Sequence, residues 1–187
     1  YRSFHRPNEA TYNDADYLRR TLEQQGHWSI AEHATATLYF TGVSRAFLAE
    51  LTRHRHLSFS VESQRFINAN NANIVAPPAM RNSQSLRDDL ELDAEGALDF
   101  YKYTAEQLLD AGLTRKQARE AARAFIPNCI ETRMVVTGNL RAWHEVIERR
   151  TKPDADAEMQ EVMRLAAQEL HTVSPIIFPK ENTSDRK

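Results

Sequence analysis

Residues 34–41 read Ala34-Thr35-Ala36-Thr37-Leu38-Tyr39-Phe40-Thr41 and are central to the choice of fold class. Small or apolar side chains alternate with polar ones, which is the two-residue period of a half-buried β-strand. Gly42 is expected to end this strand, and Ser44 can cap a helix that runs to about Arg55. The inward face of that helix would hold Phe47, Leu48 and Leu51. Its opposite face, at helical spacing, would hold Glu50, Arg53, His54 and Leu57.

The rest of the chain mixes a few short strands with longer helices. Helices are predicted at 14–25, 94–110, 114–124, 140–150 and 154–172. Extended segments are predicted at 74–76 and 131–137, and 82–93 reads as a loop or a weak helix. This irregular mixture favours an α+β fold, and 187 residues without a linker or repeat favour a single domain spanning 1–187.

Charge and cysteine content limit the function classes. The net charge is −2, so the protein as a whole does not attract nucleic acid, and any anion site must be local. Of the 24 basic residues only five are lysine, which reflects either genome base composition or a need for bidentate anion binding. Cys129 is the single cysteine, no apolar run is long enough to span a membrane, and no signal peptide is evident, so we expect a cytoplasmic protein.

The run from Arg53 to Arg65 is the densest group of chemistry-bearing residues. It holds three arginines, two histidines, three serines and a glutamine, a composition suited to phosphate and a polar heterocycle. A solvated helix end followed by a polar loop is the competing interpretation. A second polar cluster covers 26–33, where Glu32 and His33 could instead pair with neighbours. A third, scattered cluster consists of Arg123, Arg133, Asn139, Arg141 and Arg150.

The sequence lacks the motifs that usually mark several kinds of binding and catalytic site. Five glycines provide neither a dinucleotide fingerprint nor a Walker loop. A metal could use His54 with His56, or Glu32 with His33, but no zinc spacing is present, so we predict no metal. A serine hydrolase lacks its nucleophile elbow, and Cys129 fits a structural thiol better than a nucleophile. An RNA-binding module is opposed by the acidic balance and the absence of an aromatic stacking run.

Together the motifs resemble the flavin-dependent thymidylate synthases. The family signature is Arg-His-Arg, seven residues and then Ser, and it matches Arg53-His54-Arg55 with Ser63. The earlier family element matches Gly26, His27, Ser29, Glu32 and His33. Matching positions after residue 114 are 115–119, Arg123, Pro127-Asn128, Glu131-Thr132-Arg133 and Thr137-Gly138-Asn139.

The resemblance implies an α+β fold with a small mixed or antiparallel sheet and long helices. It also implies a homotetramer whose active sites combine several subunits, with FAD and dUMP stacked together. NADPH would reduce the flavin, methylenetetrahydrofolate would supply the carbon, and no cysteine would attack the uracil.

Residue roles are carried over by position. The positions implied for FAD are Ser3, His27, Ser29, Arg53, His54, Arg55, Asn139 and Arg141. Those implied for dUMP are Glu50, Ser63, Gln64, Arg65, Arg123 and Arg150. Arg150 and Ser63 are the implied catalytic residues, with Arg150 stabilising negative charge on the pyrimidine.

Three positions depart from the family pattern. Val61 replaces a Glu or Gln that bonds to the nucleotide, Asp154 replaces a histidine that contacts the flavin, and Glu145 adds a negative charge on the flavin side. They predict reduced activity, and they define the alternative function, an FAD- or nucleotide-binding homologue that has lost synthase activity.

Overall fold

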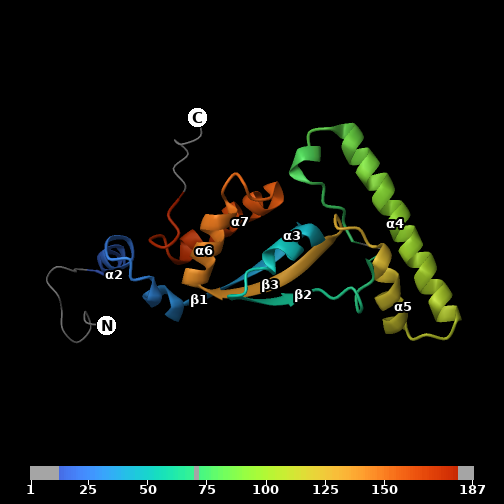
Figure 1. Ribbon diagram of the computed structural model, residues 1–187, viewed down its shortest axis with the longest axis horizontal. Coiled ribbons are helices and arrows are strands. Elements are labelled where there is room, and N and C mark those ends of the chain that lie inside the picture. The colour runs from blue at the N-terminus through green and yellow to red at the C-terminus, as the bar shows by residue number, and fades with distance from the viewer. Residues whose placement is uncertain (1–12, 70–71, 181–187) are drawn as a thin grey trace.

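The computed structural model describes residues 13–69 and 72–180. Its centre is an antiparallel sheet in the order β1-β3-β2, formed by β1 (Thr35–Ser44), β2 (Leu57–Val61) and β3 (Glu131–Asn139). Thr35 pairs with Asn139, and Leu57 pairs with Gly138 (Figure 1). The start of β2, which follows the Arg-His-Arg run, therefore lies beside the end of β3.

One face of the sheet carries the main core. Met134 and Val136 of β3 are buried, whereas Arg133 and Val135, which alternate with them, are exposed. Helices α3 (Arg45–Leu51), α6 (Leu140–Arg150) and α7 (Ala157–Val173) pack around this core (Figure 1). Trp143 of α6 is fully buried, and its indole N–H donates to the Ala36 carbonyl at 3.0 Å. This bond ties α6 to β1.

Two further groups of helices flank the sheet. The first contains α2 (Asp14–Leu18), a π-helical turn (Arg19–Gln24) and a 3₁₀ helix (Trp28–His33). The second contains a 3₁₀ turn (Pro78–Met80), α4 (Gln84–Asp110), α5 (Arg115–Ala122) and a 3₁₀ turn (Arg123–Phe125), and α4 and α5 lie at the end of the molecule opposite α2 (Figure 1). A capping box between Thr114 and Gln117 begins α5.

Most predicted elements are confirmed, and the α+β class with them. Helix α6 has the predicted bounds. Helix α7 begins three residues later than predicted, because Asp156 is its N-cap. The predicted helix at 14–25 is helical in the structure and stops before Gly26, whose φ is 67°. The extended segment at 74–76 contributes an isolated bridge between Ile74 and Ile130.

Two expectations were wrong. Gly42 does not end β1, because it sits at a bulge with φ of 67° and the strand resumes at Val43. The helix capped by Ser44 ends at Leu51 rather than at Arg55. Of the two interpretations of 82–93, a loop or a weak helix, the helix is the one observed, because residues 84–93 belong to α4, whose N-cap is Ser83.

No helix among the described residues is long and apolar enough to cross a lipid bilayer.

Candidate active site

Arg150, the last residue of α6, is the centre of a polar cluster. Its Nε donates to Nε2 of His54 at 2.8 Å, and its Nη1 lies 3.3 Å from Oε2 of Glu50. Arg53 pairs with the same Glu50 carboxylate at 3.5 Å. The Arg150 side chain is only 16% exposed, so its own contacts are partly shielded from water, whereas the Arg53 side chain is 71% exposed. We call Glu50, Arg53, His54 and Arg150 the Arg150 cluster.

His54 is held in its neutral form. Burial lowers its pKa from the ordinary value of 6.5, and the charges of Arg150, Arg149 and Arg53 lower it further, while Glu50 opposes them. Since an arginine can only donate, Nε2 of His54 accepts and Nδ1 carries the proton. This histidine is therefore suited to hydrogen bonding, and its cationic form is disfavoured.

Two adjoining clefts open beside the Arg150 cluster. The first, the Arg53 cleft, is lined by Arg53, His54, Arg55, His56, Ala142, Glu145, Val146 and Arg149. The second, the Arg141 cleft, is lined by Glu32, His56, Asn139, Arg141, Ala142 and Glu145. They share His56, Ala142 and Glu145. The pairing of Leu57 with Gly138 explains this arrangement, because it places the residues before β2 next to the start of α6.

Arg141 is held between two carboxylates. Its Nη1 lies 2.6 Å from Glu32 and its Nε lies 2.8 Å from Glu145. The hydrogen bonds that Arg141 donates to Glu145, and then to Glu32, raise the pKa of Arg141. Glu32 thus pairs with a residue 109 positions later in the chain. Asn139 caps α6, because its Oδ1 accepts from the Ala142 N–H at 2.8 Å.

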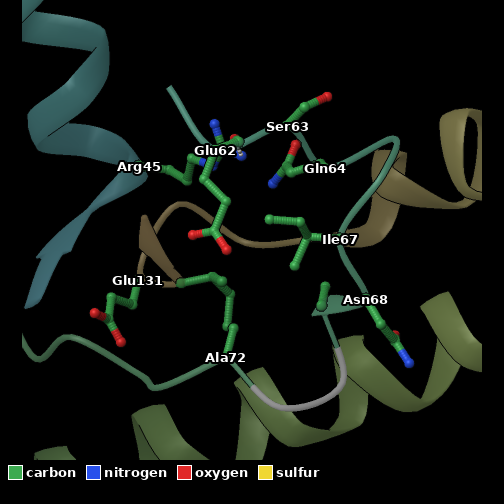
Figure 2. A pocket seen from close by; sticks show the side chains of 10 residues that line it. Arg45, Glu62, Ser63, Gln64, Ile67, Asn68, Ala72 and Glu131 are labelled. Carbon is green, nitrogen blue, oxygen red and sulfur yellow. Dashed lines mark hydrogen bonds between the residues drawn. The ribbon is translucent and has the colours of Figure 1, made fainter. Parts of the chain in front are cut away.

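Ser63 and Gln64 line a separate pocket, shown in Figure 2. Arg45 and Glu62 border it on the side of β2, and Ile67 and Ala72 lie across from them (Figure 2). We call it the Ser63 pocket. None of Glu50, His54 and Arg150 lines this pocket, and none of 63–65 lines the two clefts. In the described part of this chain, Ser63 and Gln64 therefore lie apart from Glu50 and Arg150, which line none of these three cavities.

Other predicted residues lie outside the Arg150 cluster. Arg65 forms an ion pair with Glu120 of α5 at 2.7 Å, and Arg123 is exposed after α5. His27 and Ser29 are exposed at the start of the 3₁₀ helix that also carries Glu32. Ser3 lies outside the described residues.

Three residues at these cavities were missed from the sequence. His56 lines both clefts, Arg149 lines the Arg53 cleft, and Arg45 lines the Ser63 pocket. His56 and Arg149 adjoin predicted residues and could have been added from position alone. Arg45 carried no signal, because a lone arginine in the first turn of a helix is usually solvated.

The departures from the family pattern have distinct environments. Val61 ends β2 and is partly buried, and Asp154 is exposed in the turn between α6 and α7. Glu145 is neutralised by Arg141 rather than left as an unpaired charge. Within residues 13–69 and 72–180, no three His, Cys, Asp or Glu side chains gather as a metal site.

Comparison with known proteins identifies relatives along most of the chain. The family model described as thymidylate synthase complementing protein matches residues 1–176. A probable flavin-dependent thymidylate synthase of Mycobacterium phage L5 is 46% identical over 94% of this chain and 73% of its own length. The flavin-dependent thymidylate synthase of Mycobacterium tuberculosis strain H37Rv is 40% identical over 95% of this chain and 74% of its own length.

Solved structures share the fold. A crystal structure of thymidylate synthase X from Helicobacter pylori with FAD and dUMP superimposes with a TM-score of 0.64 and 22% identity. The match covers 96% of this chain and 88% of that one. A second crystal structure of the Helicobacter pylori protein, also complexed with FAD and dUMP, gives the same TM-score at 21% identity and covers 95% of this chain and 87% of the other.

Proposed function

The chain belongs to the thymidylate synthase complementing protein family of flavin-dependent thymidylate synthases, and we propose that it converts dUMP to dTMP with FAD as cofactor. The observation that carries this proposal is the Arg150 cluster. It joins a residue proposed for the nucleotide, Arg150, to a residue proposed for the flavin, His54, through one hydrogen bond.

The clefts fit a dinucleotide such as FAD. Arg53, Arg55 and Arg149 bring positive charge to the Arg53 cleft, which suits the two phosphates of FAD. We propose that these residues hold the cofactor together with His27, Ser29, His54, Asn139 and Arg141, and that Ser3 contributes as well. When bound and reduced, FAD supplies the hydride that completes the methyl group.

We propose that Ser63, Gln64, Arg65 and Arg123 hold the dUMP phosphate. Hydroxyl, amide and guanidinium donors are the groups that bind phosphate oxygens in proteins. Glu50 and Arg150 would hold the pyrimidine. The Arg150 guanidinium is already fixed by Glu50 and His54, so it can stabilise negative charge on a uracil carbonyl with little reorganisation.

The protein's own thiol is poorly suited to covalent catalysis. Burial raises the pKa of Cys129, which disfavours the thiolate needed for attack on the uracil. This agrees with a flavin route in which no cysteine bonds to the pyrimidine. We further propose NADPH as reductant, methylenetetrahydrofolate as carbon donor, and the cytoplasm as location.

We propose a homotetramer with shared active sites. Ser63 and Gln64 line the Ser63 pocket, whereas Glu50 and Arg150 belong to the Arg150 cluster and line none of the three cavities described above. We infer that a second subunit brings the missing part of the site. The α4–α5 region also exposes large apolar side chains that an interface would cover, namely Leu92, Phe100, Tyr103, Leu109 and Phe125. Light scattering that reports a tetramer, and a smaller species for Phe100→Lys, would support this assembly. A monomeric wild type would contradict it.

The test of function is direct. Purified protein supplied with FAD, NADPH, methylenetetrahydrofolate and dUMP should form dTMP, and it should show flavin absorbance after desalting. Protein that acquires no flavin and forms no dTMP would contradict the proposal.

The alternative of a homologue without synthase activity has its own test. If Val61 and Asp154 limit the rate, Val61→Gln with Asp154→His should raise dTMP formation. If dUMP and FAD bind normally but neither the wild type nor this double variant forms dTMP, the alternative holds.

A further inference from the structure

Arg45 occupies a position that the roles above leave unexplained. It lies in the first turn of α3, is half-buried, and lines the Ser63 pocket (Figure 2). Its Nη2 donates to the backbone carbonyl of Glu62 at 3.2 Å. We propose that Arg45 is a positioning residue, which orients the Glu62–Ser63 peptide for the nucleotide phosphate. This inference rests on the proposed function.

The geometry of one peptide group carries the argument. A peptide is planar and trans, so the Glu62 carbonyl and the Ser63 N–H point in opposite directions. Holding the carbonyl from one side therefore directs the N–H to the other side. The N–H of Glu62 is also fixed, because it donates to the Arg133 carbonyl at 3.0 Å. Two hydrogen bonds, one to α3 and one to β3, thus hold Glu62, the residue immediately before Ser63.

Arg45 reaches this peptide from a firmly held helix end. The N–H and hydroxyl of Ser44 donate to the buried Glu158 carboxylate at 2.8 and 2.6 Å. The Ser44 hydroxyl in turn accepts from the Phe47 N–H at 3.0 Å, which caps α3. The backbone N–H of Arg45 donates to the Ile130 carbonyl at 3.1 Å. Because its base is fixed on both sides, Arg45 can set the position of the loop.

Stability alone does not explain an arginine here. Within the described structure its Nε is buried without a hydrogen-bond partner, which costs folding free energy. Burial lowers the pKa of Arg45, Glu62 opposes this effect, and the nearby positive charge of Arg123 adds to it. A phosphate bound near these two cations would relieve their repulsion. The two cations therefore favour an anion at this end of the pocket, which Glu62 and Glu131 also line.

The experiment compares Arg45→Met and Arg45→Lys with Arg81→Met, all loaded with FAD. Arg81 is a matched control, because it also donates to a backbone carbonyl, that of Ala76 at 3.1 Å, but lies outside the Ser63 pocket. We expect Arg45→Met to weaken dUMP binding about tenfold by calorimetry, with kcat changed less than about twofold. Arg45→Lys should recover part of the affinity, since it keeps a charged donor. Hydrogen exchange at the Ser63 amide should speed up in Arg45→Met alone.

Two results would overturn the role of Arg45. One is wild-type dUMP affinity and wild-type exchange at Ser63 in Arg45→Met. The other is an equal loss of affinity in Arg81→Met, which would indicate general destabilisation. A wild type that binds no dUMP would instead contradict the proposed function, and the exchange at Ser63 would still test whether Arg45 orients this peptide.

Discussion

Nε of Arg150 donates a hydrogen bond of 2.8 Å to Nε2 of His54, a residue 96 positions earlier in the chain. The bond joins the end of α6 to the Arg-His-Arg run. Because both residues also adjoin Glu50, a change at either one alters the other's surroundings. The relationship links the proposed pyrimidine and flavin subsites, and it makes the protonation state of one histidine important to both.

Protonation of His54 should destabilise the fold. Its folded pKa is lowered below 6.5, so the unfolded chain takes up the proton first as the pH falls. The stability contributed by neutral His54 is present above about pH 6.5 and is lost as the pH falls through the lowered folded pKa. Urea unfolding between pH 7.5 and 5.5 should therefore show a smaller pH-dependent loss in His54→Gln than in wild type. Equal losses in the two proteins would show that His54 does not titrate in this way.

Replacing Arg150 should damage chemistry more than flavin binding. Arg150→Ala removes the donor proposed for the pyrimidine carbonyl, and losing such a donor typically costs about 100-fold in kcat. Flavin content after desalting should remain close to that of wild type. Arg149→Ala gives the contrast, because Arg149 lines the Arg53 cleft proposed for FAD but does not bond to His54, so this variant should lose flavin content first. If Arg150→Ala loses flavin first, its role belongs to the cofactor site.

Glu145 should compete with the flavin for Arg141. The 2.8 Å ion pair occupies Arg141 before any ligand binds, so Glu145→Gln should tighten FAD binding about two- to fivefold. Flavin fluorescence titration measures this change. Glu148→Gln, on the same helix and 3.9 Å from His144, should leave the affinity unchanged. Equal affinities for wild type and Glu145→Gln would show that this ion pair does not limit binding.

Cys129→Ser should remain active. The thiol is half-buried and its pKa is raised by burial, so it fits a packing role. We expect wild-type kcat and a loss of about 1 kcal/mol in the free energy of unfolding. A folded but inactive Cys129→Ser protein would contradict a mechanism without a cysteine nucleophile.

The sequence predicts a helix or strand correctly where its own residues show the apolar spacing and the end caps of that element. Helix α6 has an apolar stripe and an N-cap at Asn139, and both are visible in the sequence. Strand β2 was missed although Leu57, Phe59 and Val61 alternate with serines, because the helix after Ser44 was extended too far. Residues 84–93 are polar because this part of α4 is largely exposed, and polarity alone does not separate an exposed helix from a loop.

The sequence predicts which residues form the proposed site, but it does not predict how they are arranged. The motif selected His54 and Arg150, yet their contact depends on how α6 lies against the segment before β2. The ion pairs of Arg65 with Glu120 and of Arg141 with Glu32 join distant segments in the same way. Such pairs are consequences of tertiary packing, and the spacing of apolar residues along one helix or strand does not predict them. The separation of Ser63 and Gln64 from Glu50 and Arg150 follows from the same cause.

The measurement that tests the central claim most directly is calorimetric titration of dUMP into protein reconstituted with FAD. We predict saturable binding of one dUMP per subunit, weaker in Arg150→Ala and weaker in protein without flavin. This prediction would be contradicted if FAD-loaded wild type showed no saturable dUMP binding. It would also be contradicted if the affinity for dUMP changed neither on removal of the flavin nor in Arg150→Ala.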